Sequence, residues 1–172
     1  MSRPQRVVLV GFMGSGKSTV GPLLAEMLGW DFLDLDRAIE ARAARSVAEI
    51  FRQEGEPSFR LREREAALEQ RDRTRLVVAA GGGALLDPAT RESLRRRALL
   101  VWLRCDLDTA LHRIRLDGSR PLLENRERMA QLMAEREACY RRADLAVDAA
   151  AGSASDTTRR VWAVVKGPLG LL

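Results

Sequence analysis

One stretch near the start of the chain limits its possible folds more than any other. Residues 11–18 read Gly-Phe-Met-Gly-Ser-Gly-Lys-Ser, which fits the pattern G-x-x-x-x-G-K-[ST] of a phosphate-binding loop. Its three glycines let the backbone curl so that N–H groups surround an anion. Lys17 supplies a charge that reaches the β- and γ-phosphates, and the Ser18 hydroxyl is a ligand for Mg²⁺. The stretch therefore predicts that a triphosphate tail is held here.

The residues on either side supply the setting that such a loop needs. Residues 7–10 are an apolar run typical of a buried parallel strand, and residues 18–28 have an apolar face at helical spacing before Gly29. A helix that begins at the loop directs its N-terminal dipole at the bound anion. A glycine-rich turn without a ligand is the alternative, and the complete motif between a strand and a helix argues against it.

Length and composition indicate one globular domain. The chain has 172 residues, and we expect a single domain over 1–172 with a core over about 6–166. No apolar run is long enough to span a membrane, and the N-terminus lacks the pattern of a signal peptide. Cys105 and Cys139 fit neither a disulfide framework nor a metal site, so we expect reduced thiols in a cytoplasmic protein.

The basic charge of the chain does not by itself indicate nucleic-acid binding. The net charge is +5, but the arginines alternate with acidic residues, as in residues 60–65, and aromatic residues are few. Such patterning is typical of solvated, salt-bridged helix faces. We therefore expect small anionic ligands and neither a nucleic acid nor a membrane as partner. Lys17 stands out, because the only other lysine is Lys166.

Strand and helix signals alternate along the chain, which predicts an α/β fold with a parallel sheet. We expect strands over 7–10, 30–36, 76–80, 99–103 and 145–147. We expect helices over 18–28, 37–44, 46–55, 57–72, 87–97, 106–116, 126–142 and 156–166, with a polar connection over 152–155 and a ragged tail over 167–170. Residues 116–125 contain Asp-Gly-Ser-Arg-Pro and are expected to form a mobile lid that brings Arg120 over the phosphates.

Polar residues and glycines follow the second and third predicted strands, at the sheet edge where parallel sheets bind ligands. Asp34 and Asp36 are two apart, so on a regular strand both carboxylates would face one side. One could hold Mg²⁺ through water while the other accepts or orients a hydroxyl proton, but either could instead cap the next helix. Gly81–Gly83 could be a flexible turn or a place where backbone approaches a ligand.

Taken together, these motifs resemble the shikimate kinase family. The resemblance covers about residues 6–148 and rests on order and spacing: the loop at 11–18, Asp34-Leu35-Asp36, residues 55–60, Gly81–Gly83, and Arg120 with the Pro-Leu-Leu after it. It implies a three-layer α/β/α P-loop kinase fold with a five-stranded parallel sheet of order 2-3-1-4-5 and a mobile lid. It also implies transfer of the ATP γ-phosphate to the 3-hydroxyl of shikimate. We expect the protein to be a monomer.

The resemblance also implies roles for individual residues. Asp36, Lys17 and Arg120 would be catalytic, while Ser18 and, through water, Asp34 would hold Mg²⁺. The shikimate-binding region would span about 36–63. ATP would contact Gly14, Ser15, Gly16, Lys17, Ser18, Thr19, Arg113 and Arg120. Shikimate would contact Asp36, Arg60, Gly81, Gly82, Gly83 and Arg136, with Glu63 anchoring Arg60 and with Phe51 and Phe59 near the ring.

The chain departs from the family pattern after its last strand. Residues 148–153 lack the basic residue that relatives often place beside the adenine, and Arg159 or Arg160 is the nearest replacement. Another small-metabolite kinase, such as a gluconate kinase, and a P-loop protein that binds nucleotide without catalysis are the alternatives. A gluconate kinase, or a nucleoside monophosphate kinase, is not expected to carry Gly81–Gly83 together with Phe59 and Arg60. A nucleotide binder without catalysis would not need Asp36, Arg60 and Arg136 around one cavity.

Overall fold

A parallel five-stranded sheet runs through the middle of the molecule. The structure is a computed structural model and describes residues 3–117 and 126–171. The strands are β1 Arg6–Val10, β2 Asp31–Asp34, β3 Leu76–Ala79, β4 Ala98–Arg104 and β5 Leu145–Asp148. Their order is β2-β3-β1-β4-β5, and every neighbouring pair is parallel. The predicted fold class and the strand order 2-3-1-4-5 are confirmed.

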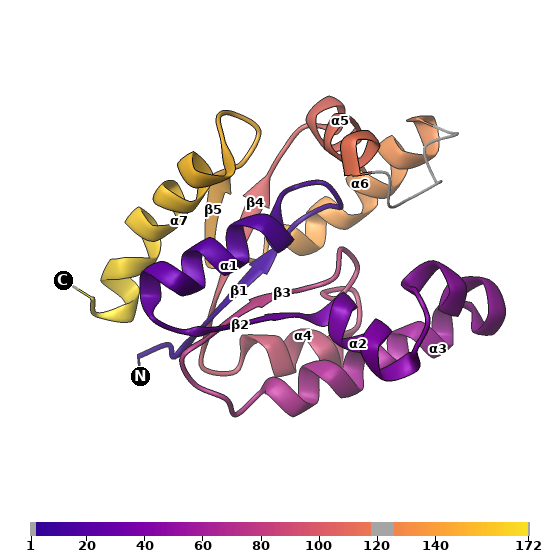
Figure 1. The fold of residues 1–172 in the computed structure, drawn as a ribbon, viewed down its shortest axis with the longest axis horizontal. Coiled ribbons are helices and arrows are strands. Elements are labelled where there is room, and N and C mark those ends of the chain that lie inside the picture. Colours follow the sequence, from indigo (N-terminus) through magenta and orange to yellow (C-terminus); the bar gives the residue numbers. More distant parts are fainter. Residues whose placement is uncertain (1–2, 118–125, 172) are drawn as a thin grey trace.

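Helices cover both faces of this sheet, which gives three layers (Figure 1). They are α1 Lys17–Leu28, α2 Leu35–Ala43, α3 Val47–Gln70, α4 Pro88–Arg95, α5 Leu107–Asp117, α6 Arg126–Tyr140 and α7 Ala154–Leu169. Helices α1 and α7 pack side by side over one face, and the others lie over the opposite face or beyond the carboxyl ends of the strands. Among the described residues, no helix is both long and apolar enough to cross a membrane.

The core is divided between the two faces by the alternation of side chains along each strand. In β1, Val7 and Leu9 pack with α1 and α7, whereas Val8 and Val10 pack with the helices of the other face. All five residues of this central strand are buried. A strand that is buried on both faces reads as a continuous apolar run, which is why the sequence pattern located it.

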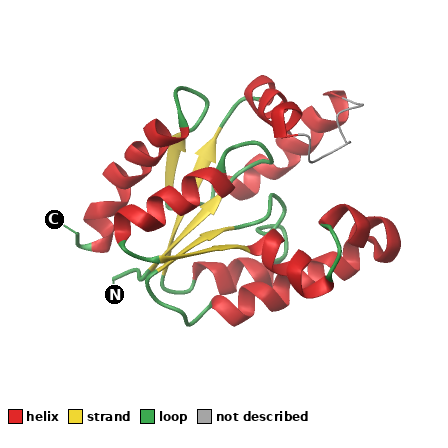
Figure 2. Cartoon of the chain, viewed as in Figure 1, coloured by secondary structure: helices red, strands yellow, loops and turns green. Residues whose placement is uncertain are grey.

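The second strand ends earlier than expected, and the prediction that Asp36 lies on a strand is wrong. The Asp34 carboxylate accepts a hydrogen bond from the Arg37 amide at 3.3 Å and caps α2, which begins at Leu35. Asp36 therefore lies in the first turn of α2. This helix follows the end of β2 directly, without a loop between them (Figure 2). The alternation argument that put both carboxylates on one strand face does not hold, although helix geometry still brings both to the same edge of the sheet.

Other boundaries follow from local backbone chemistry. A capping box at Ser46 and Glu49 opens α3, and Gly55, with φ of 82°, breaks the helical path between the helices expected over 46–55 and 57–72. Helix α7 already begins at Ala154, within the expected connection. The prediction of a ragged tail is wrong, because α7 continues through residues 167–169 and ends at the left-handed cap Gly170. Most of the predicted lid, including Arg120, lies outside the described residues.

A buried arginine fixes the ends of two helices beneath the sheet. Arg6 on β1 is fully buried, and its guanidinium donates to the carbonyl oxygens of Gln70 at 2.8 Å, Ser93 at 3.0 Å and Arg96 at 2.5 Å. These acceptors lie at or near the C-terminal ends of α3 and α4, where carbonyls lack helical partners. The contact holds α3 in place, and α3 carries part of the candidate site.

Candidate active site

The loop at residues 11–18 curls tightly and packs against α5. Gly14 and Gly16 have φ of 78° and 98°, in the left-handed region that favours glycine. A Cβ at Gly14 would lie 2.5 Å from the carbonyl oxygen of Ala110 on α5, so a larger residue would push the loop and the helix apart. Gly16 is also the N-cap of α1, which places the helix N-terminus at the loop. Free N–H groups and the helix dipole make this an anion site.

Lys17, Ser18 and Asp34 lie together at the entrance to this loop. The Lys17 ammonium donates to the carbonyl oxygens of Gly11 at 2.7 Å and Phe12 at 3.0 Å, which folds its side chain back over the loop. The Ser18 hydroxyl donates to the Asp34 carboxylate at 2.5 Å. A hydroxyl and a carboxylate oxygen are suitable ligands for Mg²⁺, which usually completes its shell with water and phosphate oxygens. In the described part of the chain, no cluster of three or more His, Cys, Asp or Glu residues could hold a metal without such help.

A cavity of about 360 Å³ extends from the loop across the carboxyl ends of the strands. Its lining joins predicted phosphate-binding residues to predicted acceptor-binding residues. The lining consists of Met13, Gly14, Gly16, Lys17, Ser18, Thr19, Asp34, Asp36, Ala79, Ala80, Gly82, Arg113, Ile114 and Arg136. The structure therefore brings Asp36 and Arg136 to one cavity with the phosphate loop, although the chain separates them by 100 residues.

The three glycines after β3 are packed against site side chains rather than left as a loose turn. A Cβ at Gly81 would lie 2.6 Å from Glu63 Oε1 and 2.8 Å from Asp36 Oδ1. A Cβ at Gly82 would lie 2.9 Å from Arg136 Nη1, and one at Gly83 would lie 2.3 Å from Arg60 Nη2. Each glycine thus leaves room for a charged group of the site. This close approach is the physical reason for the triplet, and the turn alternative does not account for it.

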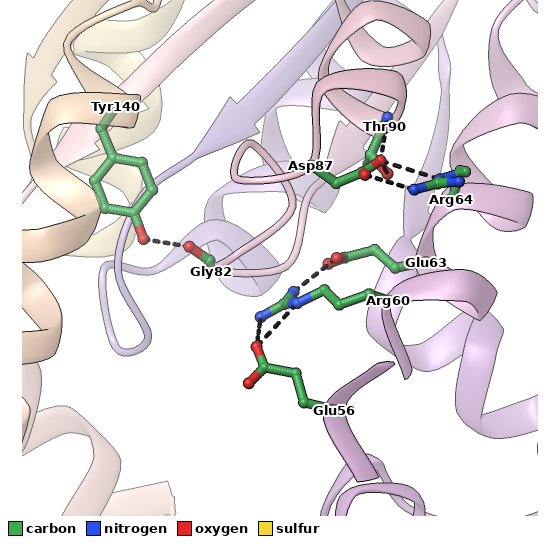
Figure 3. Close-up of polar contacts among 8 residues, drawn as sticks. All are labelled: Glu56, Arg60, Glu63, Arg64, Gly82, Asp87, Thr90 and Tyr140. Atoms are coloured by element: carbon green, nitrogen blue, oxygen red, sulfur yellow. Dashed lines mark hydrogen bonds and ion pairs between the residues drawn. The ribbon is translucent and has the colours of Figure 1, made fainter. Parts of the chain in front are cut away.

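Arg60 is held between two glutamates of α3 (Figure 3). Its Nη1 atom lies 2.7 Å from Glu63 Oε2, and its Nη2 atom lies 3.1 Å from Glu56 Oε1. The Glu63 side chain is fully buried, whereas the Glu56 side chain is 59% exposed. Burial raises the pKa of Glu63, and the Arg60 guanidinium offsets only part of that rise. Arg60 itself does not line the cavity and lies behind Gly83.

Arginines on other elements border the two ends of the cavity. Arg136 on α6 lies over the Phe12 ring, with 5.9 Å between its guanidinium carbon and the ring centroid. Arg113 on α5 donates to the carbonyl oxygens of Gly14 and Ser15, both at 3.3 Å, and of Ala149 at 2.6 Å. Arg113 therefore connects the phosphate loop with the segment that follows β5.

Between the two candidates for the missing basic residue, the contacts favour Arg160. Arg160 donates to the carbonyl oxygens of Asp148 and Ala151, both at 2.7 Å, and so shapes the loop after β5. Arg159 instead pairs with Asp156 at 2.5 Å on the surface of α7. Arg160 therefore contacts the loop after β5 from the first turns of α7.

Two predicted site residues lie elsewhere than expected: Asp36 is on a helix rather than a strand, and Arg60 does not line the cavity. Ser15, Gly81 and Gly83 are buried and support the cavity without lining it, and the rings of Phe51 and Phe59 pack 4.8 Å apart. Met13 and Ile114 of the lining were not predicted, and neither was Tyr140, whose hydroxyl donates to the Gly82 carbonyl. A lone tyrosine on a helix carries no pattern that signals such a contact.

Comparisons with known proteins agree with this geometry. A family model described as shikimate kinase matches residues 13–166. Shikimate kinases of Moorella thermoacetica and Halorhodospira halophila are each 44% identical to the chain, over 95% of this chain and 95% of the relative. A solved structure of shikimate kinase from Acinetobacter baumannii in complex with shikimate is 36% identical, with a TM-score of 0.89, over 95% of this chain and 94% of that one.

Proposed function

The chain belongs to the shikimate kinase family, and we propose that it transfers the γ-phosphate of ATP to the 3-hydroxyl of shikimate. The observation that carries the proposal is the single cavity that joins the phosphate loop to Asp36, Gly82 and Arg136. A site that only held nucleotide would not need a carboxylate and a guanidinium across from the loop. Small molecules are the proposed partners, and a monomeric state remains a prediction.

On the phosphate side, backbone amides of residues 14–19 and the N-terminus of α1 would surround the phosphates of ATP. Lys17 would exchange its contacts with loop carbonyls for the β- and γ-phosphates, where its charge stabilises the transferred group. Arg113 would lie near the base, and Arg120 of the predicted lid would add a second positive charge. Because phosphoryl transfer proceeds through a loose transition state, placement and charge supply most of the rate.

On the acceptor side, Arg60 and Arg136 would bind the carboxylate of shikimate, because guanidinium groups form paired hydrogen bonds with carboxylates. The glycines at 81–83 would let the ring approach the backbone closely. Asp36 would hold the 3-hydroxyl and take its proton. The hydroxyl oxygen then bonds to the γ-phosphorus while the bond between that phosphorus and ADP breaks.

Magnesium fits the residues at the entrance to the loop. The Ser18 hydroxyl and the Asp34 carboxylate would hold the ion, the latter through water, beside the phosphates. When bound, the ion neutralises charge on the phosphate oxygens. The hydrogen bond from Ser18 to Asp34 holds the hydroxyl and the carboxylate next to each other at the loop.

The test is a coupled assay of ATP consumption with shikimate, gluconate, AMP and CMP as acceptors. We expect turnover that depends on shikimate, and Asp36→Asn should lower kcat by about 10²-fold or more, as for loss of a group that orients and deprotonates the nucleophile. Turnover with gluconate or a nucleotide and none with shikimate would overturn the proposal. Undiminished transfer by Asp36→Asn would overturn the role of Asp36 alone.

A further inference from the structure

Tyr140 contacts the acceptor side of the cavity from outside its lining. It is the only tyrosine of the chain, it ends α6, and it is 3% exposed. Its ring packs against Trp102 with centroids 6.0 Å apart, and its hydroxyl donates to the carbonyl oxygen of Gly82 at 2.5 Å (Figure 3). The hydroxyl is therefore directed at the glycine turn by a ring that is fixed in the core.

The Gly82 carbonyl differs from the carbonyls of Gly81 and Gly83 in the source of its hydrogen bond. The Gly81 and Gly83 carbonyls accept from the amides of Ala84 and Leu86, both at 3.0 Å, within the same turn. The Gly82 carbonyl accepts instead from a side chain 58 residues away. Three consecutive glycines have wide backbone freedom. Of these three, only Gly82 lines the cavity, so the contact with Tyr140 restrains the glycine that a ligand would meet.

The same helix also carries Arg136, one turn before Tyr140. A Cβ at Gly82 would lie 2.9 Å from Arg136 Nη1 and 3.7 Å from Tyr140 Oη, so both side chains close around this residue. Residues four apart on a helix share a face. The distance between the Gly82 peptide and the Arg136 guanidinium is thus set by one rigid element.

We propose that Tyr140 is a positioning residue for shikimate, which keeps the Gly82 peptide and the Arg136 guanidinium at the spacing that the acceptor requires. The inference rests on the proposed function, because it takes Gly82 and Arg136 as contacts of shikimate. Tyr140 itself does not touch the reacting atoms. Its role is to keep Gly82 and Arg136, the two proposed contacts of the substrate, at a fixed spacing.

The hydroxyl stays a donor at every pH at which such an enzyme works. Burial raises the pKa of Tyr140 well above its usual range, and the Arg136 guanidinium offsets only part of that rise. A hydroxyl that keeps its proton gives a constant hydrogen bond to the Gly82 carbonyl. The contact therefore acts as a fixed restraint rather than as a pH switch.

The first test is Tyr140→Phe, which keeps the ring and removes the hydroxyl. We expect the KM for shikimate to rise about tenfold, because the Gly82 carbonyl loses its hydrogen bond and its spacing from Arg136 is no longer fixed. The KM for ATP should stay within about twofold of the wild-type value. The matched control is Thr158→Val, which removes a buried hydroxyl that donates to the Ala154 carbonyl at 2.7 Å in α7, on the other face of the sheet. Each variant should lower the unfolding midpoint by about 2–4 °C.

The outcomes separate this inference from the function on which it rests. A Tyr140→Phe variant as unstable as Thr158→Val but with an unchanged KM for shikimate would mean that Tyr140 is only structural. If the wild-type protein showed no turnover that depends on shikimate, the proposed function itself would be wrong.

A second measurement does not require a substitution that could fail to fold. Because Tyr140 is the only tyrosine, growth with 3-fluorotyrosine labels this position alone. We expect its fluorine resonance to shift when shikimate is added and to shift less with ADP. A resonance that shikimate leaves in place would overturn the inference.

Discussion

The two sides of the cavity are built in different ways. The phosphate side is built around one continuous stretch, the loop at 11–18, in which Lys17 contacts the carbonyls of Gly11 and Phe12 and which Asp34 and Arg113 join from other elements. The acceptor side takes Asp36 from α2, Arg60 and Glu63 from α3, three glycines from the turn after β3, and Arg136 with Tyr140 from α6. The first is held by local backbone geometry, and the second by packing between distant elements.

This difference predicts different costs of mutation. On the phosphate side, the hydrogen bonds of Lys17 to Gly11, Phe12 and Ser15 stay within its own loop, so its removal should affect catalysis and leave the fold stable. The acceptor side contains charges that are buried with their partners, so removal of one partner leaves an uncompensated charge. There, substrate binding and stability should fall together.

The largest effect should come from Lys17→Ala. We expect kcat to fall by about 10³-fold or more, since a preorganised charge on the transferred phosphoryl group is lost. The free energy of unfolding should change by less than about 1 kcal/mol, because the hydrogen bonds of Lys17 to Gly11, Phe12 and Ser15 lie within its own loop. The measurements are the coupled assay and denaturant unfolding.

The control for this variant is Lys166→Ala, at the only other lysine, which is exposed on α7. It should leave both kcat and stability unchanged. If Lys17→Ala retained most of its activity, or unfolded as readily as a core variant, the contrast between the two sides would fail.

An intermediate effect is expected from Glu63→Gln, which removes the buried partner of Arg60. The KM for shikimate should rise about tenfold, and the free energy of unfolding should fall by about 2–4 kcal/mol, since a broken buried pair leaves one charge behind. The lower part of that range is favoured because Arg60 is 17% exposed and keeps its contact with Glu56.

Glu56→Gln is the matched control, because Glu56 binds the same arginine from an exposed position. Its cost should stay below about 1 kcal/mol, as for surface ion pairs. Equal effects of the two substitutions on unfolding and on the KM would show that burial does not distinguish the two glutamates.

The smallest effect is expected from Asp87→Ala, at the outer support of the acceptor side. Asp87 caps α4 by accepting from the Thr90 amide at 2.8 Å, and it pairs at 2.6 Å with Arg64 of α3, the helix that also carries Arg60 (Figure 3). Loss of this cap should lower the free energy of unfolding by about 1 kcal/mol at pH 7. The KM for shikimate should rise by about twofold, as a looser support gives a small loss of binding.

The effect of Asp87→Ala should also depend on pH. The hydrogen bond from Arg64, together with the Thr90 cap, holds the pKa of Asp87 well below its usual range. A carboxylate with a lowered folded-state pKa stabilises the protein above its unfolded-state pKa of about 3.9, and this stabilisation is lost as the pH falls further. The difference in stability between wild type and variant should therefore shrink progressively as the pH falls below about 4.

Asp106→Ala provides the comparison on the phosphate side. Asp106 accepts from the Thr109 amide at 2.7 Å at the start of α5, in the same Asp-x-x-Thr pattern. A similar loss of stability is expected, without a change in the KM for shikimate. A rise in that KM in both variants would mean that the two sides of the cavity are not supported separately.

Patterns that act over a few residues could be predicted from the sequence. The phosphate loop, the caps at Ser46, Asp87 and Asp106, and the break at Gly55 all depend on backbone groups within one turn of the chain. The sheet order was predicted through resemblance to a family, not through any single pattern. Asp34 was expected to bind metal or to cap, and the hydrogen bond that makes it the cap displaced Asp36 from the strand.

What the sequence determined by itself is the phosphate loop at 11–18, because its geometry arises from consecutive residues. Only the tertiary structure decided the acceptor side, where the reason for three glycines is the position of Glu63, Asp36, Arg136 and Arg60 beside them. Only the tertiary structure decides two further features: the contact of Tyr140 with Gly82 and the burial of Arg6 against two helix ends. Such contacts join residues about 60 to 90 apart, and no local pattern encodes them, because they exist only once the strand order has brought their elements together.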